Sequence, residues 1–278
     1  MQREGPTGVP AEAIARAAEW IRNADALLIT ASAGVGVDSG LPDFRGDEGL
    51  WRAYPALGTL KHSFQSIANP SAFRAAPLLA WGFYGHRLKC YREIDPHAGF
   101  TVLRRWAARM WHGAFIYTSN VDGQFQKAGF EESDILECHG SIHYLQCAKP
   151  CCQQVWPAAG FDPVIDERAC QMIGDVPRCA HCGGLARPNI LMFGDNQWLE
   201  DRTEGQMGRM RRWNTLAERL VVVEIGAGLA LPTVRRVSER HAPRLVRINT
   251  HEPQIDPAKG VGIRGGALET LLAIDAAL

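Results

Sequence analysis

Ala26-Leu27-Leu28-Ile29-Thr30, followed directly by Ala31-Ser32-Ala33-Gly34-Val35-Gly36, is the stretch that decides the fold class of this 278-residue chain. A short run of almost wholly apolar residues predicts a strand that is buried on both faces, and such strands occur in parallel sheets covered by helices. The glycine-rich turn that follows is typical of a strand that ends at a ligand site. The stretch therefore predicts an α/β fold.

Further apolar runs predict more strands of the same kind; they are residues 114–118, 135–136, 189–193, 220–225 and 245–249. Segments with a helical pattern lie between or beside them; they are residues 11–22, 76–91 and 100–110. Because strands and helices alternate, we expect a parallel sheet with helices on both faces.

Small and polar residues stand at or after the ends of four of the apolar runs. These motifs are residues 31–36, Ser119 to Asp122, Gly226 to Gly228, and Asn249. Ligands of parallel sheets bind beyond the carboxyl ends of the strands, so the four motifs are expected to form one site. Backbone N–H groups at the first turn can approach a diphosphate closely.

A second loop, Ser39-Gly40-Leu41-Pro42-Asp43-Phe44-Arg45-Gly46, is bounded by glycine and contains proline. Nothing in folding requires the Pro-Asp-Phe-Arg combination, and binding residues usually lie on loops. We therefore interpret Asp43, Phe44 and Arg45 as binding residues.

The cysteines predict a metal site. Cys179-Ala180-His181-Cys182-Gly183-Gly184 is a two-residue-spaced knuckle, and Cys147-Ala148-Lys149-Pro150-Cys151 is its partner. Four thiolates around one zinc ion form a closed structural site. Cys152 competes with Cys151 as a ligand; we favour Cys151 because it gives the shorter knuckle. His181 is expected to be exposed.

The formal net charge is +0, from 30 basic and 30 acidic residues, which provides no general attraction to nucleic acid or to an anionic membrane. No apolar run approaches the roughly 20 residues that span a bilayer, and residues 1–10 lack the apolar stretch of a signal peptide. We expect a soluble, cytoplasmic protein without a direct nucleic-acid or membrane partner.

Taken in order, the motifs resemble those of the sirtuin (Sir2) family, bacterial type, whose members are NAD-dependent protein deacylases. The resemblance runs from residue 26 to residue 249. The matching segments are Ala33-Gly34, Ser39-Gly40-Leu41-Pro42-Asp43-Phe44-Arg45, Ser119-Asn120-Val121-Asp122-Gly123, Gln126-Lys127-Ala128-Gly129, His139-Gly140, the four cysteines, Arg187-Pro188-Asn189, Phe193-Gly194 and Asn249.

The resemblance implies a domain organisation. Residues 1–140 and 188–278 would form a Rossmann-type NAD-binding domain, and residues 141–187 a smaller inserted zinc-binding module, with the helical part of the small lobe within residues 47–95. An acylated-lysine protein or peptide would lie in the cleft between them and add a strand by backbone pairing.

The resemblance also assigns ligand contacts. The co-substrate NAD would be held by Ser32, Ala33, Gly34, Asp43, Phe44, Arg45, Ser119, Asn120, Asp122, Gly226, Ala227, Gly228 and Asn249. One structural zinc would be held by Cys147, Cys151, Cys179 and Cys182.

The family reaction gives His139, Asn120 and Asp122 catalytic roles. Nicotinamide leaves NAD while the acyl-amide oxygen attacks the ribose, and water finally releases free lysine and O-acyl-ADP-ribose. His139 would act as general base for a ribose hydroxyl, since histidine binds protons near working pH. Asn120 and Asp122 would hold the ribose and the nicotinamide amide.

Three departures from the family pattern fall on the cofactor contacts. Ser32 replaces the usual glycine, Ser119 replaces the usual glutamine, and Gly226-Ala227-Gly228 replaces glycine-threonine-serine. The last change removes two hydroxyl donors to phosphate but leaves the backbone donors. We expect the reacting groups to be retained and the cofactor contacts to be weaker.

Four residues are expected to bind the substrate: Tyr84, Arg87, Phe193 and Gly194. Tyr84 and Arg87 share one face of a predicted helix. In the sirtuins that remove succinyl or malonyl groups, a Tyr-x-x-Arg pair holds the acid end of the acyl chain. The pair therefore favours acidic acyl groups here, and deacetylation alongside them stays open.

Two other functions compete with deacylation. Capture of the ADP-ribosyl group by water or by a protein side chain would make the chain an NAD hydrolase or a mono-ADP-ribosyltransferase. Alternatively, the chain would be a non-catalytic NAD-sensing interaction module. The presence of His139, Asn120 and Asp122 argues against the second alternative, because a sensor needs no base.

Overall fold

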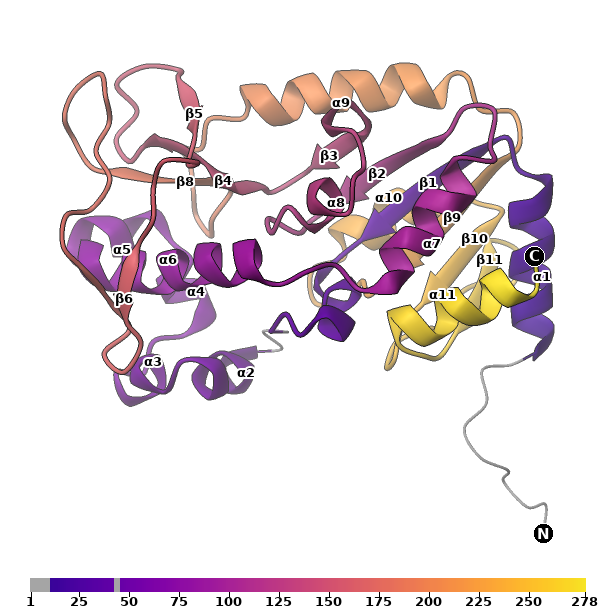
Figure 1. Ribbon diagram of the computed structural model, residues 1–278, viewed down its shortest axis with the longest axis horizontal. Helices are drawn as coiled ribbons and strands as arrows, with labels where there is room; N and C mark the ends of the chain where they lie inside the picture. Colours follow the sequence, from indigo (N-terminus) through magenta and orange to yellow (C-terminus); the bar gives the residue numbers. More distant parts are fainter. Residues whose placement is uncertain (1–10, 43–45) are drawn as a thin grey trace, which may run out of the picture.

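The computed structural model of the protein describes residues 11–42 and 46–278 (Figure 1). Within this part of the chain, the main sheet has six strands, all parallel, in the order β11-β10-β9-β1-β2-β3. The strands are β1 (Ala26–Ala31), β2 (Ala114–Thr118), β3 (Ile135–Glu137), β9 (Leu220–Ile225), β10 (Leu245–Ile248) and β11 (Gly260–Ile263). The predicted α/β fold is confirmed.

The strand order reverses beside β1. The chain continues from β1 to β2 and β3 on one side, and later returns to β9, β10 and β11 on the other side. The chain therefore runs from β1 and from β9 to opposite sides of the sheet, which makes the boundary between these two strands a topological switch point. This switch point is where the sequence predicts the ligand site.

Side chains alternate between two helical layers because successive residues of a strand face opposite ways. Leu27 and Ile29 of β1 pack toward α1 (Ala11–Asn23), α7 (Ala98–Ala107) and α11 (Ala267–Ala276). Leu28 packs toward α9 (Asp201–Asn214) and α10 (Thr233–Arg240). All six side chains of β1 are buried, as expected for a strand covered on both faces.

A second lobe lies on the left in Figure 1 and has its own hydrophobic core. It contains an antiparallel sheet of β4 (Gly140–Cys147), β5 (Val155–Pro157) and β8 (Ala186–Ile190), and a hairpin of β6 (Val164–Asp166) and β7 (Gln171–Ile173). Its helices are α2 (Gly46–Ala53), α3 (Pro55–Thr59), α4 (Phe64–Ile67), α5 (Pro70–Ala75) and α6 (Pro77–Glu93).

The prediction of a parallel-sheet strand at residues 189–193 is wrong. The strand at this place is β8, which ends at Ile190 and pairs antiparallel with β4 outside the main sheet. Its buried residues include Arg187 and Asn189, whose polar groups bond to Asp195 and Gln146. An apolar run shows burial, but it does not show which sheet a strand joins.

The remaining short elements connect these layers. They are the 3-10 turns η1 (Ala33–Val35), η2 (Val37–Ser39) and η3 (Glu132–Asp134), and the helix α8 (Gln124–Lys127). Among the described residues, none of the helices combines the length and the apolar character needed to cross a membrane.

Candidate active site

The ends of β1 and β2 form the floor of the site. Ser119 Oγ donates to Ser32 Oγ at 3.0 Å, and the Asn120 side-chain amide donates to the Ser32 carbonyl at 3.2 Å. Both bonds join residues 87 or 88 positions apart in sequence. Ser32 and Ser119, which are both departures from the family pattern, are thus hydrogen-bonded partners.

Asp122 lies in the same loop and is 8% exposed. Its carboxylate accepts from the Gln124 backbone N–H at 2.9 Å, and His143 Nε2 lies 2.8 Å from its backbone oxygen. Burial raises the pKa of Asp122 from 3.8 to about 6. The carboxyl group therefore changes its charge close to neutral pH.

His139 lies between β3 and β4, where the chain passes from one sheet to the other. Burial lowers the pKa of His139, and a hydrogen bond with the Ser119 backbone opposes that effect. Gly140, which follows, has φ +74°, and a Cβ atom there would lie 2.1 Å from the Asn189 carbonyl oxygen. The His-Gly pair therefore fits a turn that only glycine can complete.

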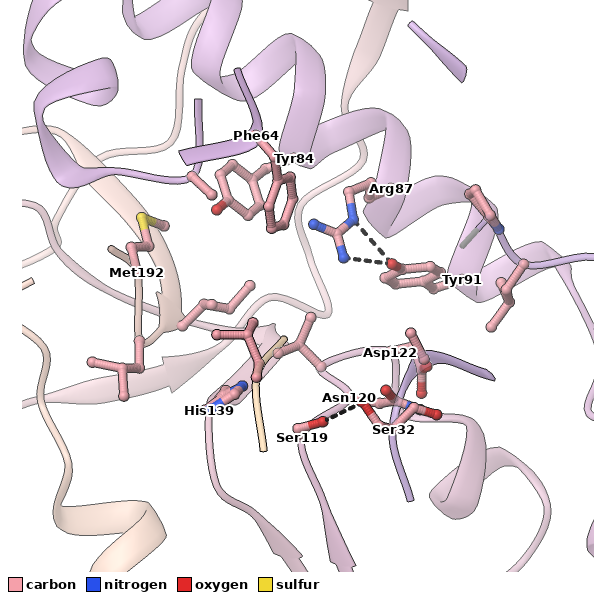
Figure 2. A pocket seen from close by; sticks show the side chains of 18 of the residues that line it. Ser32, Phe64, Tyr84, Arg87, Tyr91, Ser119, Asn120, Asp122, His139 and Met192 are labelled. Atoms are coloured by element: carbon pink, nitrogen blue, oxygen red, sulfur yellow. Dashed lines mark hydrogen bonds between the residues drawn. The ribbon is translucent and has the colours of Figure 1, made fainter. Parts of the chain in front are cut away.

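A cavity of about 390 Å³ is lined by Ser32, Ser119, Asn120, Asp122 and His139. Figure 2 shows Ser32, Ser119, Asn120 and His139 on one side and Tyr84, Arg87 and Tyr91 of α6 on the other. The full lining comprises Ser32, Ala33, Leu41, Pro42, Phe64, Ala68, Tyr84, Arg87, Tyr91, Ser119, Asn120, Val121, Asp122, His139, Ile190, Leu191, Met192, Phe193 and Leu231.

Phe193 borders this cavity, but its backbone is already paired. Its N–H donates to the Ala68 carbonyl and its carbonyl accepts from the Asn69 side chain, both at 2.9 Å. A substrate strand that adds here must therefore pair with other backbone groups. Gly194, the other predicted substrate residue of this segment, is not among the residues that line the cavity.

A second cavity of about 350 Å³ lies beside the switch point; its lining includes Gly34, Asp38, Gly226, Asn249 and His251. Gly34 and Gly226 meet there: a Cβ atom on Gly34 would lie 2.6 Å from Gly226 Cα. Two bare backbones that approach so closely form the kind of cradle that a diphosphate needs. The residues present in this cavity therefore fit the diphosphate of a dinucleotide.

Asn249 holds loops together within this second cavity. Its side-chain nitrogen donates to the Ala227 carbonyl at 2.9 Å, and its side-chain oxygen accepts from the backbone of His251 and Glu252. Ala227 and Gly228 line neither cavity. The described geometry thus gives Asn249 a positioning contact with the loop after β9.

The cysteines form a compact cluster of Cys147, Cys151, Cys179 and Cys182, whose sulfur atoms all lie within 4.8 Å of one another. The Sγ–Sγ distances are 3.7 Å for Cys147–Cys182 and 3.7 Å for Cys151–Cys179. A tetrahedral zinc with Zn–S bonds of about 2.3 Å has S–S edges of about 3.8 Å, so the cluster fits this metal.

Cys152 lies outside that tetrad, beside Cys151 and His181. The geometry therefore favours Cys151 as the fourth ligand. His181 is exposed, as expected.

Three predicted binding residues, Asp43, Phe44 and Arg45, lie outside the described residues. Conversely, sequence reasoning missed Tyr91, Met192, Asp38 and His251, which line the two cavities. Tyr91 was detectable in principle, since it lies four residues after Arg87 on one helix face.

A parallel sheet with a glycine cradle at its switch point, joined to a cysteine-cluster lobe, defines the class of dinucleotide-binding α/β proteins with a zinc module. The model of the Sir2 family matches residues 32–226, and the chain belongs to this family.

Two relatives illustrate the match. The NAD-dependent protein deacylase of Daphnia pulex is 32% identical over 198 residues, which cover 63% of this chain and 66% of the relative. The NAD-dependent protein deacylase of Thermococcus kodakarensis is 28% identical over 264 residues, 93% of each chain. A solved structure that addresses the mechanism and regulation of Sir2 enzymes shares the fold, with a TM-score of 0.69 and 24% identity over 96% of this chain and 97% of that one.

Proposed function

We propose that this protein is an NAD-dependent protein-lysine deacylase. It transfers the acyl group of a modified lysine to the ADP-ribose part of NAD, releasing nicotinamide, lysine and O-acyl-ADP-ribose. The observation that supports this most is the shared cavity, in which His139 faces the loop of Asn120 and Asp122 beside the switch point. The relatives named above carry the same activity in their names.

NAD supplies the ribose that accepts the acyl group. The side chains around the ribose orient it and take a proton from its hydroxyl group. Because burial lowers the pKa of His139, its imidazole is neutral at pH 7 and able to take a proton from a hydroxyl group. Asn120 and Asp122 hold the polar groups of the leaving end. Leu191, Met192 and Phe193 form an apolar part of the wall of the same cavity.

We further propose that residues 1–140 and 188–278 form the NAD-binding domain, apart from the helical part of the small lobe within residues 47–95, and that residues 141–187 form the zinc-binding module. An acylated-lysine protein segment would bind between them.

His139→Ala tests the assignment of the base. Turnover of an acyl-lysine peptide should fall by a factor on the order of 10² or more, because loss of a general base typically costs that much. His241→Ala is a matched control, since His241 follows the C-terminal end of α10 and lines neither cavity, and its side-chain Nδ1 lies 2.8 Å from the Val237 carbonyl oxygen. Undiminished NAD-dependent deacylation by His139→Ala would overturn the mechanism.

The products separate deacylation from its alternatives. Protein, NAD and acyl-lysine peptides should yield free lysine and O-acyl-ADP-ribose, identified by mass. ADP-ribose without deacylated peptide would indicate an NAD hydrolase, and an ADP-ribosylated protein would indicate a transferase.

The finer part of the proposal is that Tyr84 and Arg87 select acidic acyl chains. A charge-assisted bond between a partly buried arginine, as Arg87 is, and a carboxylate contributes on the order of 1.5–3 kcal/mol. Arg87→Met should therefore lower kcat/KM on succinyl-lysine by roughly ten-fold or more and spare acetyl-lysine. Equal losses on the two substrates would show that Arg87 supports the fold instead.

A further inference from the structure

A fully buried ion pair joins the two ends of a segment that lines the main cavity. Arg187 Nη2 lies 2.8 Å from Asp195 Oδ2 and donates to Asp195 Oδ1 at 2.9 Å, and both side chains are 0% exposed. Arg187 belongs to β8, and Asp195 follows residues 190–193, which line the cavity. Met192 of this segment is among the side chains that Figure 2 shows around the cavity.

The two charged groups also bind the backbone of this segment. Arg187 Nη1 donates to the Ile190 carbonyl at 3.2 Å. Both backbone groups of Met192 bond to Asp195: the Met192 N–H donates to Asp195 Oδ2 at 3.4 Å, and the Met192 carbonyl accepts from the Asp195 N–H at 3.3 Å. The carboxylate also accepts from the Gln197 N–H at 3.0 Å. The ion pair therefore fixes the backbone of the segment at more than one point.

Phe193 and Gly194 form the tip of the turn that these bonds close. The Met192 carbonyl bonds to the N–H three residues later, and Gly194 has φ +64°, a combination typical of a β-turn with glycine at its third position. The Phe193 backbone is bonded to residues 68–69, between α4 and α5. The turn is thus attached to the helical part of the small lobe at its tip and to Asp195 at its base.

The burial of this pair makes each partner depend on the other. A charge that is out of contact with water needs an opposite charge and hydrogen-bond partners, and removal of one partner leaves the other uncompensated. Among the described residues, Asp195 is the carboxylate that bonds to Arg187, and Arg187 Nε has no hydrogen-bond partner. Asp195 therefore determines where the guanidinium lies, and the guanidinium in turn holds the Ile190 carbonyl.

We propose that Arg187 and Asp195 are positioning residues for substrate binding: their ion pair holds residues 190–193 in the conformation that receives the acyl-lysine segment. Neither side chain lines the cavity, so the pair acts through the backbone that it binds. The inference rests on the proposed deacylase function and adds to it the contacts that order one wall of the substrate site.

The binding of NAD should not depend on this pair. The second cavity, which contains the glycine cradle, is lined by residues of the large domain, and residues 187–197 contribute nothing to it. A segment that is already ordered binds its ligand without a further loss of conformational entropy. A loosened segment should therefore weaken the binding of an acyl-lysine peptide and leave that of NAD unchanged.

Asp195→Asn tests the proposal, because it removes the negative charge and changes the size of the side chain little. The peptide, carrying the acyl group that the wild type removes fastest, would be varied at saturating NAD, and NAD at saturating peptide. We expect KM for the peptide to rise roughly ten-fold, which corresponds to about 1.4 kcal/mol. Both kcat and KM for NAD should stay within roughly three-fold. Thermal unfolding would check that the variant is folded at the assay temperature.

The double variant Arg187→Met with Asp195→Asn serves where the single variant does not fold. It removes both charges, and replacing a buried ion pair by uncharged groups is often neutral for stability, whereas loss of one partner is strongly destabilising. The bond from Arg187 to the Ile190 carbonyl is lost together with the ion pair. The same rise in KM for the peptide is therefore expected.

Glu224→Gln is the matched control. The Glu224 side chain is also 0% exposed, and it is paired with Arg247, whose side chain is 2% exposed. This pair joins β9 to β10, and neither residue lines either cavity. The control variant should lose stability for the same reason as Asp195→Asn and leave KM for the peptide unchanged.

Three results would overturn the proposal. They are an unchanged KM for the peptide in a folded variant, an equal rise in KM for NAD, and the same rise in KM for the peptide in Glu224→Gln. A wild type without NAD-dependent deacylation would instead refute the proposed function. In that case, binding of a fluorescent acyl-lysine peptide without turnover, followed by anisotropy, still tests the ion pair: Asp195→Asn should bind it roughly ten-fold more weakly than the wild type, and equal binding would refute the positioning role.

Discussion

Asp122 is a carboxyl group that lies almost out of contact with water, in the wall of the main cavity. Burial raises its pKa to about 6 in the folded protein, against 3.8 in an exposed chain. Between these two values the folded state binds more protons than the unfolded state, so stability falls as pH rises through that range. Above pH 6 the folded protein holds a buried charge that destabilises it.

Asp122→Asn should therefore stabilise the protein while abolishing most activity. The gain in the free energy of unfolding should be at most on the order of 2–3 kcal/mol above pH 6 and should vanish near pH 4. Urea unfolding of the variant and the wild type at pH 8 and at pH 4 would measure this gain. The exposed Asp162→Asn is a suitable control, and a variant that is less stable than wild type at pH 8 would contradict the expectation.

The paired hydroxyls of Ser32 and Ser119 also belong to the residue scale. Each replaces a residue that is usual in the family, and together they form a bond between the ends of β1 and β2. Two residues 87 positions apart in the sequence are therefore direct partners in the structure.

At the scale of elements, the site depends on how closely the turns after β1 and β9 approach. The Gly34 N–H donates to the Gly226 carbonyl at 3.3 Å, and either glycine would place a Cβ atom within 2.6 Å of the other's Cα. The parallel pairing of β1 with β9 brings these two turns to the same edge of the sheet.

Gly34→Ala should therefore force the two turns apart. We expect a destabilisation of about 1–3 kcal/mol, the usual cost of overpacking, together with a raised KM for NAD. Thermal unfolding and NAD titration would measure both. Gly160→Ala is the control, because a Cβ atom at Gly160 has nothing within 4 Å; unchanged stability and KM in Gly34→Ala would show that the approach is not needed.

At the scale of the whole molecule, β4 connects the two chemical centres. It starts at Gly140, directly after His139, and ends at Cys147 in the metal cluster. In its pairing with β8, Cys147 lies opposite Ala186 and Gly140 lies opposite Ile190. The strand pair spans about 23 Å at the usual rise per residue, so the metal supports one end of a sheet whose other end borders the cavity.

Loss of zinc should therefore weaken the whole small lobe. Metal analysis should find about one zinc per chain, and Cys179→Ser should lose it and melt several degrees lower, since about 1 kcal/mol corresponds to roughly 2–4 °C in a chain of this size. Cys152→Ser should keep its metal. A metal-free wild type that is as stable as the zinc-loaded protein would refute the zinc site. Loss of metal in Cys152→Ser but not in Cys151→Ser would show that Cys152 is the fourth ligand in place of Cys151.

The sequence by itself determined the fold class and the order of the motifs. The apolar run at β1 and the glycines after it predict a buried strand that ends at a ligand site. Burial and chain reversal can be predicted from local composition and from residue spacing. The spacing of Cys179 and Cys182 likewise marks a metal knuckle, since both ligands come from one short loop.

Only the tertiary structure decided which distant residues meet. It placed residues 189 and 190 in the small sheet and residues 191–193 outside any strand, put Cys151 rather than Cys152 in the cysteine tetrad, and joined Arg87 to Tyr91 and Ser32 to Ser119. These outcomes depend on which surfaces pack together and on side-chain direction. Local sequence patterns record that a residue is buried but not what it is buried against.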